Sequence, residues 1–305
     1  MHDVIIVGGG PAGLSAALVL GRSRRNALVL DGAEPRNAAS LAAHSFLTRD
    51  GTRPSELLDI ARQELERYPS VELRATEALG ASVEPAGFEV TLANSGSEYC
   101  QKLLLATGVK DALPALPGLE RLWGTSVFHC PYCDGWEVRG GALAVYARGA
   151  EAMDFVPILL GWSDDLVLCT DGPSGLSDRA KDELEHNSVR VIETPIARLE
   201  GEIRLERIVF RDGSAIAREA LFIKSSPRGR NGVAAQLGCG LTEHGIIEVT
   251  DERETSVPGV YAAGDGAARF HQIIIAAASG SEAAIMINRA LAMEDFAAGR
   301  RASIV

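Results

Sequence analysis

Residues 4–13 read VIIVGGGPAG, an apolar run of four residues followed by a glycine-rich turn. A continuous apolar run of this kind is typical of a buried parallel strand. The turn has the spacing G-x-G-x-x-G, from Gly8 to Gly13, and the helical pattern of Leu14–Leu20 follows it. In such a turn Gly10 lets the backbone approach a pyrophosphate, while the outer glycines allow the tight bend and the close packing of helix on strand. The stretch therefore predicts a dinucleotide-binding β–α unit.

Small and acidic residues follow the later strands of the same pattern. The apolar strand Ala27–Leu30 ends at Asp31, and a carboxylate about twenty residues after the turn can hold a ribose hydroxyl. The strand at residues 102–106 ends in Ala-Thr-Gly, where small residues leave room for a cofactor. The strand at residues 259–263 ends in a Gly-Asp-Gly turn that suits a polyol hydroxyl. The expected cofactor contacts are Gly8, Gly10, Pro11, Ala12, Gly13, Asp31, Ala106, Thr107, Gly108, Gly264 and Asp265.

Three further polar residues are candidates for the same site. His44 lies in an irregular polar stretch that could reach over a cofactor, although it is equally typical of an ordinary loop histidine. His271 and Gln272 precede the apolar helix of Ile273–Leu291, whose N-terminus is a source of positive dipole. The alternative for this pair is a role in capping the helix.

A second chemical motif is HCPYCDG, at residues 129–135. Cys130 and Cys133 are spaced so that their sulfurs can close a small disulfide ring, and opening that ring stores two electrons. His129 could supply a positive charge to a thiolate, and Asp134 could exchange a proton with a leaving thiolate. The alternatives are half of a zinc site or two ordinary buried thiols. We favour redox chemistry and expect no metal, since the other cysteines stand alone with no histidine at ligand spacing: Cys100, Cys169 and Cys239.

A second strand–turn–helix pattern, from residue 142 to residue 160, repeats the first with altered chemistry. Ala147 stands where the first glycine should be, and Glu151 falls in the first turn of the helix, where a carboxylate competes with phosphate. The next strand, Leu166–Cys169, leads to Asp171 without an arginine pair for a 2′-phosphate, although Asp171 could hold a 2′-hydroxyl. We predict a retained fold in which NADPH binding is weak or lost.

Composition limits the class of protein. The chain has 305 residues, 46% of them apolar, which is enough for two packed domains. A net charge of −11 without a basic run argues against nucleic acid as a partner. No apolar stretch is expected to reach the length of a membrane span, and the first residues do not read as a signal peptide. Five cysteines do not form a secreted disulfide framework, so a cytoplasmic location is expected.

The order of these motifs resembles the low-molecular-weight thioredoxin reductase family. The resemblance covers nearly the whole chain and rests on the first glycine turn, Ala106-Thr107-Gly108, Cys130-Pro131-Tyr132-Cys133-Asp134-Gly135 and Gly264-Asp265. It implies an α/β fold of two Rossmann-like (three-layer ββα) dinucleotide-binding domains, the second inserted in the first. Residues 1–114 and 244–305 would form the FAD-binding domain, and residues 115–243 the inserted redox-disulfide and NAD(P)-binding-like domain.

The resemblance also implies a homodimer and roles for single residues. Cys133 would be the sulfur next to the flavin, Cys130 the sulfur that attacks substrate, and Asp134 the acid/base. Asp265 and Gln272 would lie along the ribityl chain and the flavin ring.

The altered second turn makes the chain more similar to two side branches of the family. One is the deeply rooted thioredoxin reductase-like flavoproteins, which lack a functional NADPH site. The other is the gliotoxin and holomycin type of dithiol oxidase, which passes electrons to oxygen; His129 and His271 as bases would favour it. We expect an FAD-dependent thiol–disulfide oxidoreductase acting on a thioredoxin-like protein or a small dithiol. The dithiol oxidase and a non-catalytic flavoprotein redox sensor remain as alternatives.

Overall fold

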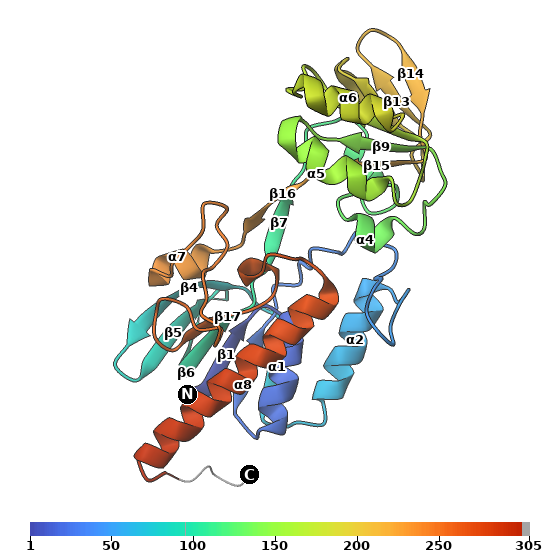
Figure 1. The fold of residues 1–305 in the computed structure, drawn as a ribbon. Helices are drawn as coiled ribbons and strands as arrows, with labels where there is room; N and C mark the ends of the chain where they lie inside the picture. The colour runs from blue at the N-terminus through green and yellow to red at the C-terminus, as the bar shows by residue number, and fades with distance from the viewer. Residues whose placement is uncertain (95, 301–305) are drawn as a thin grey trace. The chain divides into compact units, whose positions relative to one another are not determined.

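The computed structural model describes residues 1–94 and 96–300 and has a mixed α/β architecture (Figure 1). It divides into two compact units. The first contains Met1–Ala38, Phe46–Asp111 and the chain from Pro227 onward; the second contains Ala39–Ser45 and Ala112–Ser226. The main body of the second unit is therefore an insertion in the first. The predicted α/β fold, with one Rossmann-like unit inserted in another, is confirmed.

The first unit is built on a parallel sheet whose central strand, β1, is the apolar run before the glycine turn. Val4, Ile5 and Ile6 are fully buried, because both faces of this sheet are covered. In sheet order the parallel strands are β3 (Val71–Arg74), β2 (Ala27–Leu30), β1 (His2–Val7), β6 (Ser97–Leu105) and β17 (Val260–Ala262). Two antiparallel strands continue from β6: β5 (Gly87–Leu92) and β4 (Ala78–Glu84).

Helices and the β4–β5 pair complete the layers of this unit. On one face, α1 (Pro11–Arg22), α2 (Pro54–Leu65) and α8 (Ile273–Ala297) enclose a common apolar core with the sheet. On the other face the core includes β4, β5 and the short helix α7 (Gly232–Leu237). This three-layer arrangement places the glycine turn at the carboxyl end of β1, where α1 begins.

The second unit repeats the plan on a smaller scale. Its parallel strands, in sheet order, are β11 (Arg190–Ile192), β10 (Leu166–Cys169), β9 (Leu143–Tyr146), β15 (Ala220–Ile223) and β8 (Val127–Phe128). Helices α5 (Gly149–Leu159) and α6 (Asp178–His186) cover one face. The other face is covered by α3 (Leu119–Leu122) and an antiparallel sheet of β12 (Ile196–Glu200), β13 (Arg207–Phe210) and β14 (Ala215–Ala217).

The boundaries of the compact units differ from the expected domain limits at residues 114 and 243. The chain leaves the first unit along β7 (Val109–Ala112) and returns along β16 (Ser226–Gly229), and these two strands pair. Residues 227–243, expected in the inserted domain, pack with the first unit because α7 lies against β4 and buries Val233 and Ala234 there. A proline-rich segment marks the outward crossing in the sequence, and the return falls at Pro227, two residues before Gly229.

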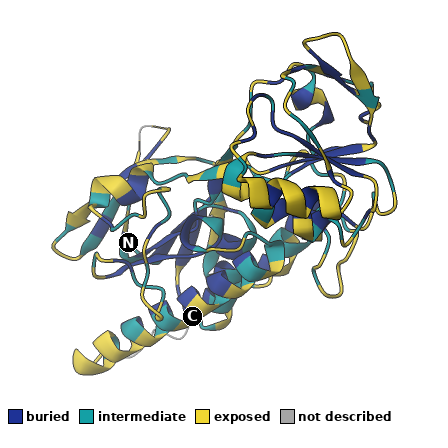
Figure 2. Cartoon of the chain, turned by 45° about the horizontal axis from the view of Figure 1, so that its top comes forward, coloured by how far each residue is buried: buried dark blue, intermediate teal, exposed yellow. Residues whose placement is uncertain are grey.

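Helix α8 is long and apolar enough, by length and composition alone, to cross a membrane. This differs from the expectation that no apolar stretch reaches that length. Core helices of globular proteins pass the same test, and Ala283 and Ile287 of α8 are fully buried in the core that it shares with α1. Figure 2 shows the parallel strands as buried and the C-terminal end of α8 as exposed, where Met293 and Phe296 lie.

Candidate active site

The two motif cysteines form a disulfide at the start of a one-turn helix, α4 (Pro131–Asp134). Their Cα atoms are 5.3 Å apart, and the backbone N–H groups of Cys133 and Asp134 both donate to the carbonyl of Cys130, each at 3.2 Å. Pro131 at the first helical position suits this turn, because its fixed φ favours helix initiation and it has no N–H to satisfy. The predicted pairing of Cys130 with Cys133 is confirmed.

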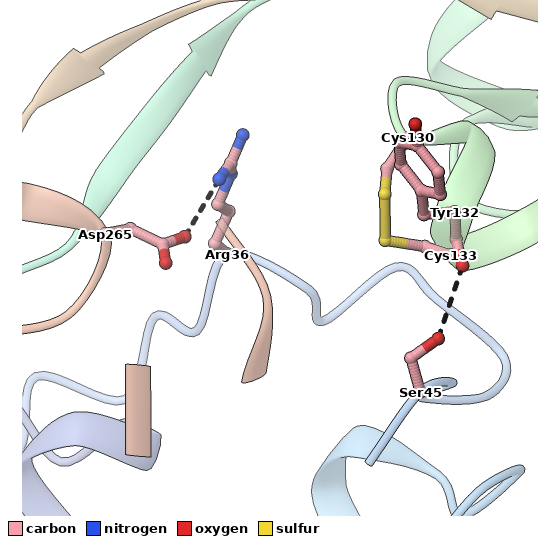
Figure 3. The surroundings of a disulfide bond; sticks show 6 residues. All are labelled: Arg36, Ser45, Cys130, Tyr132, Cys133 and Asp265. Carbon is pink, nitrogen blue, oxygen red and sulfur yellow. Dashed lines mark hydrogen bonds and ion pairs between the residues drawn. A yellow bond between two sulfur atoms is a disulfide. The ribbon is translucent and has the colours of Figure 1, made fainter. Parts of the chain in front are cut away.

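Aromatic side chains lie around this disulfide turn. Tyr132, between the two cysteines, is 61% exposed and makes an edge contact with Trp162 at 5.7 Å between ring centroids. Its carbonyl accepts a hydrogen bond from Oγ of Ser45 at 3.4 Å (Figure 3). Trp136 is 64% exposed, and the guanidinium of Arg139 lies 3.9 Å from its ring centroid. The turn therefore presents flat apolar surface to a partner that approaches the disulfide.

Asp134 ends α4, next to Cys133 in the chain. Burial raises its pKa to about 7; the negative charge of Glu137 adds to the increase, and His44 opposes it. A carboxyl group with a pKa near neutral can both give and take a proton at physiological pH. Asp134 therefore has the property that the sequence interpretation required of an acid/base.

His129 and His44, the two histidines predicted to lie near reactive groups, each contact a side chain of the second unit. His129 stacks on Trp123, with ring centroids 5.6 Å apart. His44, predicted as a possible cofactor contact, lies in the disulfide-bearing unit, with Nε2 3.5 Å from Oε1 of Glu137. Its place beside the disulfide turn was not visible in the sequence, because more than eighty residues separate it from Glu137.

The first glycine turn is tightly packed at Gly8 and Gly13 and open at Gly10. Gly8 has φ of +118°, and a Cβ added there would lie 2.2 Å from the carbonyl oxygen of Ala106. At Gly13 an added Cβ would lie 1.9 Å from the carbonyl oxygen of Gly8, so only glycine allows the helix to pack this closely. Gly10 differs, since an added Cβ would meet no atom within 4 Å. The space in front of Gly10 is therefore open, and Pro11 and Ala12 begin α1 beside it.

A buried polar atom lies at the end of the neighbouring strand. Thr107 follows β6, and its Oγ1 is buried without a hydrogen-bond partner among the described residues. A buried hydroxyl left unpaired costs free energy, so such an atom points to a ligand that is not part of the chain. Together with the open space at Gly10 and the small residues Ala106 and Gly108, it fits the expected dinucleotide.

Acidic residues of the same unit are held by arginines that the sequence interpretation did not identify as partners. Oδ2 of Asp31 accepts from Arg62 at 2.9 Å, and Oδ1 accepts from the N–H of Ala33. Arg36 contacts Asp111 through two nitrogens, at 2.7 and 2.6 Å, and donates to Oδ2 of Asp265 at 2.8 Å (Figure 3).

Burial lowers the pKa of Arg36, but the hydrogen bonds and charges of Asp111 and Asp265 outweigh burial and raise it overall. Arg36 thus stays charged and fixes the orientation of Asp265, although 229 positions separate these two residues in the sequence. The basic residue in a polar loop was the only sequence signal for this contact.

The last two predicted cofactor contacts lie at the start of α8. A ring nitrogen of His271 lies 3.2 Å from the carbonyl of Ala268. Gln272 is the N-cap of α8, but its side chain makes no capping hydrogen bond. The alternative role of Gln272, capping the helix with its side chain, is therefore not observed.

At the second turn, polar groups of the chain pair with one another. Glu151 lies in the first turn of α5, as predicted. Oδ1 of Asp171 accepts from the N–H of Ile196 at 2.6 Å, and Oδ2 accepts from the hydroxyl of Tyr146 at 3.3 Å. Arg148, which the sequence interpretation missed, donates to the carbonyls of Thr170 and Asp171. Both oxygens of Asp171 therefore have protein partners, as both oxygens of Asp31 do at the first turn.

Among residues 1–94 and 96–300, no cluster of three or more His, Cys, Asp or Glu side chains could hold a metal ion.

Comparison with known proteins shows extended similarity. The family model described as pyridine nucleotide-disulphide oxidoreductase matches residues 2–280. Thioredoxin reductase tcpT of Claviceps purpurea is 32% identical over 303 residues, which cover 95% of this chain and 94% of that relative. The putative thioredoxin reductase TrxB from Bacillus anthracis superposes with a TM-score of 0.92 at 34% identity, covering 97% of this chain and all of the other. The structure of HlmI superposes with a TM-score of 0.93 at 35% identity, covering 98% and 95%.

Proposed function

The chain belongs to the pyridine nucleotide-disulphide oxidoreductase family and is a thioredoxin reductase-like oxidoreductase; from that premise we propose how its disulfide works. The pair Cys130–Cys133 exchanges two electrons with a dithiol or disulfide partner. The observation that carries this proposal is the disulfide itself, next to a carboxyl group whose pKa is about 7.

Exchange with a substrate disulfide takes two displacements. The thiolate of reduced Cys130 attacks one substrate sulfur; the substrate S–S bond breaks as a mixed disulfide forms. Asp134 gives its proton to the leaving sulfur. Asp134 next takes the proton of Cys133, and the resulting thiolate attacks Sγ of Cys130. The mixed disulfide breaks as the protein disulfide closes, and the second substrate sulfur leaves as a thiolate that takes a proton from water. The substrate is reduced to a dithiol and the cysteine pair is oxidised; a dithiol substrate runs the same steps in reverse.

The residues of the first unit are proposed to hold FAD, which supplies a two-electron couple when bound. Gly8, Gly10 and Gly13 shape the turn for the pyrophosphate, and the unpaired hydroxyl of Thr107 provides a polar contact. Asp31 contributes a ribose contact, and Asp265, oriented by Arg36, contributes a hydroxyl contact further along the cofactor. Family resemblance supports these roles, and it gives Cys133 the exchange with the cofactor.

NADPH is proposed to be a weak reductant. Support comes from the second turn, where Glu151 places negative charge at the start of α5. This observation favours a second candidate function, in which a dithiol reduces the enzyme and oxygen accepts the electrons.

We further propose a cytoplasmic homodimer that acts on a thioredoxin-like protein or a small dithiol, with neither nucleic acid nor membrane as a partner. The acidic net charge supports the absence of nucleic acid.

An anaerobic bleaching assay tests these proposals on the purified yellow protein. NADPH, NADH and a small dithiol are added in turn, and flavin absorbance is followed. We expect rapid bleaching by the dithiol and little by either nucleotide; the opposite order contradicts the proposal. Admission of oxygen then separates the two functions, because an oxidase produces hydrogen peroxide at the rate of dithiol consumption, whereas a reductase does not.

A further inference from the structure

A loop from a distant part of the sequence is held against the disulfide turn at two points. The segment Ala39–Ser45 belongs to the same compact unit as the disulfide. His44 approaches Glu137 with 3.5 Å between Nε2 and Oε1, and Ser45 donates to the carbonyl of Tyr132 at 3.4 Å. The side chain of His44 is 20% exposed and that of Glu137 is 41% exposed, so solvent screens their interaction only in part.

These two side chains act on Asp134 in opposite directions. After burial, the negative charge of Glu137 is the next influence that raises the pKa of Asp134, and His44 lowers it. Other groups of the turn that carry charge or titrate have different contacts: Arg139 lies over Trp136, and His129 stacks on Trp123.

We propose that His44 and Glu137 are positioning residues for thiol–disulfide exchange, and that together they set the protonation state in which Asp134 meets a substrate sulfur. This inference rests on the proposed function, in which Asp134 moves the proton. The negative charge of Glu137 favours the protonated form of Asp134, and the contact between Glu137 and Nε2 of His44 opposes that effect.

The test uses single-turnover exchange, which needs no turnover of the flavin. The protein is reduced with dithiothreitol, freed of excess reagent under anaerobic conditions and mixed with a small aromatic disulfide over a range of pH. In Glu137→Gln the inflection of rate against pH should move down, and in His44→Gln it should move up, each by about half a unit to one unit. A merely structural role would not produce shifts of opposite sign.

Matched controls come from α6 of the same unit, where Glu185 and His186 are exposed. Glu185→Gln and His186→Gln should leave the inflection in place. In an Asp134→Asn background, the opposite shifts from Glu137→Gln and His44→Gln should disappear. His44→Asn and Glu137→Ser replace either variant if circular dichroism shows that it does not fold.

Three outcomes overturn the inference: no shift, shifts of the same sign, or opposite shifts that persist without Asp134. Failure of the proposed function is distinguishable from these, because the wild-type protein would then show no single-turnover exchange at all. Normal exchange with an unshifted profile removes only the role of His44 and Glu137.

Discussion

The two strand–turn–helix units of this chain follow the same backbone plan, but the polar groups at their turns differ. At the first turn, the position of a Cβ on Gly10 is open, and the hydroxyl of Thr107 is buried without a hydrogen-bond partner among the described residues. At the second, Arg148 donates to two carbonyls beside the turn, and both oxygens of Asp171 accept from the chain. The parallel sheet and its crossover helix are present in both units, because apolar burial maintains the fold independently of the residues at the turn.

The largest effect is expected from a substitution in the first glycine turn. Gly10→Val should give colourless protein, since the added side chain occupies the open space in which a pyrophosphate would lie. The fold should survive, because Gly10 has φ of −80° and no atom nearby to clash with. Absorbance at flavin wavelengths and circular dichroism check the two statements. Gly232→Val is the matched control, since Gly232 also has open space; a yellow, fully loaded Gly10→Val protein would refute the site.

The second prediction concerns the second unit, which contains the Cys130–Cys133 disulfide, and tests whether both sulfurs are needed for turnover. Cys130→Ser and Cys133→Ser should each lower turnover with a disulfide by about a thousandfold or more, since each removes a sulfur that must form a bond. Only Cys130→Ser should show a long-wavelength charge-transfer band, from the remaining Cys133 thiolate and oxidised flavin. Cys169→Ser, at a buried free thiol, serves as the control. A band confined to Cys133→Ser would reverse the roles of the two sulfurs.

The third prediction concerns the proton. Asp134→Asn should slow exchange by about a hundredfold or more while the flavin stays bound, because an amide cannot transfer the proton. In the wild-type protein, the step that needs protonated Asp134 should become slower as pH rises through about 7, the value to which burial raises the pKa of Asp134. Stopped-flow exchange across pH measures both effects. An unchanged rate in Asp134→Asn would remove this residue from the mechanism.

The fourth prediction concerns the affinity of the second turn for NADPH. NADPH should bind at least about a hundredfold more weakly than at an intact turn, because Glu151 repels phosphate at the start of α5 and the guanidinium of Arg148 is engaged by the carbonyls of Thr170 and Asp171. Stopped-flow bleaching with micromolar NADPH should therefore be slow. Reduction at many turnovers per second would show that this turn is intact in function.

The smallest expected effect is a partial repair of the second turn. The double variant Ala147→Gly with Glu151→Gln should strengthen nucleotide binding by about tenfold, because it removes backbone crowding and the negative charge at the start of α5. Nucleotide titration followed by tryptophan fluorescence provides the measurement. Asp154→Asn, on the same helix but beyond its first turn, should have no such effect; equal gains from both variants would point to net charge instead.

Much of the fold was predictable because its strands are local apolar runs. The strands Ala27–Leu30 and Leu166–Cys169 lie where the sequence placed them. The elements that were not predicted are less apolar: β4 carries Gly80 and Glu84, and α6 is predominantly polar. The return of the chain to the first unit at residue 227 was also not predicted, because that boundary depends on what α7 packs against.

For the candidate site too, features that are local in sequence were predictable and contacts between distant segments were not. The disulfide was predictable from a spacing of three residues, because the geometry of a short turn is local. The contacts of Arg36 with Asp265, of Arg148 with Asp171 and of His44 with Glu137 were not, since they join segments from 23 to 229 positions apart. The space in front of Gly10 and the unpaired hydroxyl of Thr107 likewise depend on tertiary packing.

The insertion has a consequence for how the chain is made. Strand β6 pairs with β17, and α1 packs along α8, so the first unit lacks a strand and a helix until the C-terminal part has been synthesised. The inserted unit is almost continuous in sequence, so its sheet can form during synthesis, before the C-terminal strand and helix of the first unit have been made. At typical elongation rates the wait between β6 and β17 is on the order of ten seconds. In the proposed cofactor site, which combines Gly10 with Asp265, cofactor binding is therefore expected to be one of the last events in maturation.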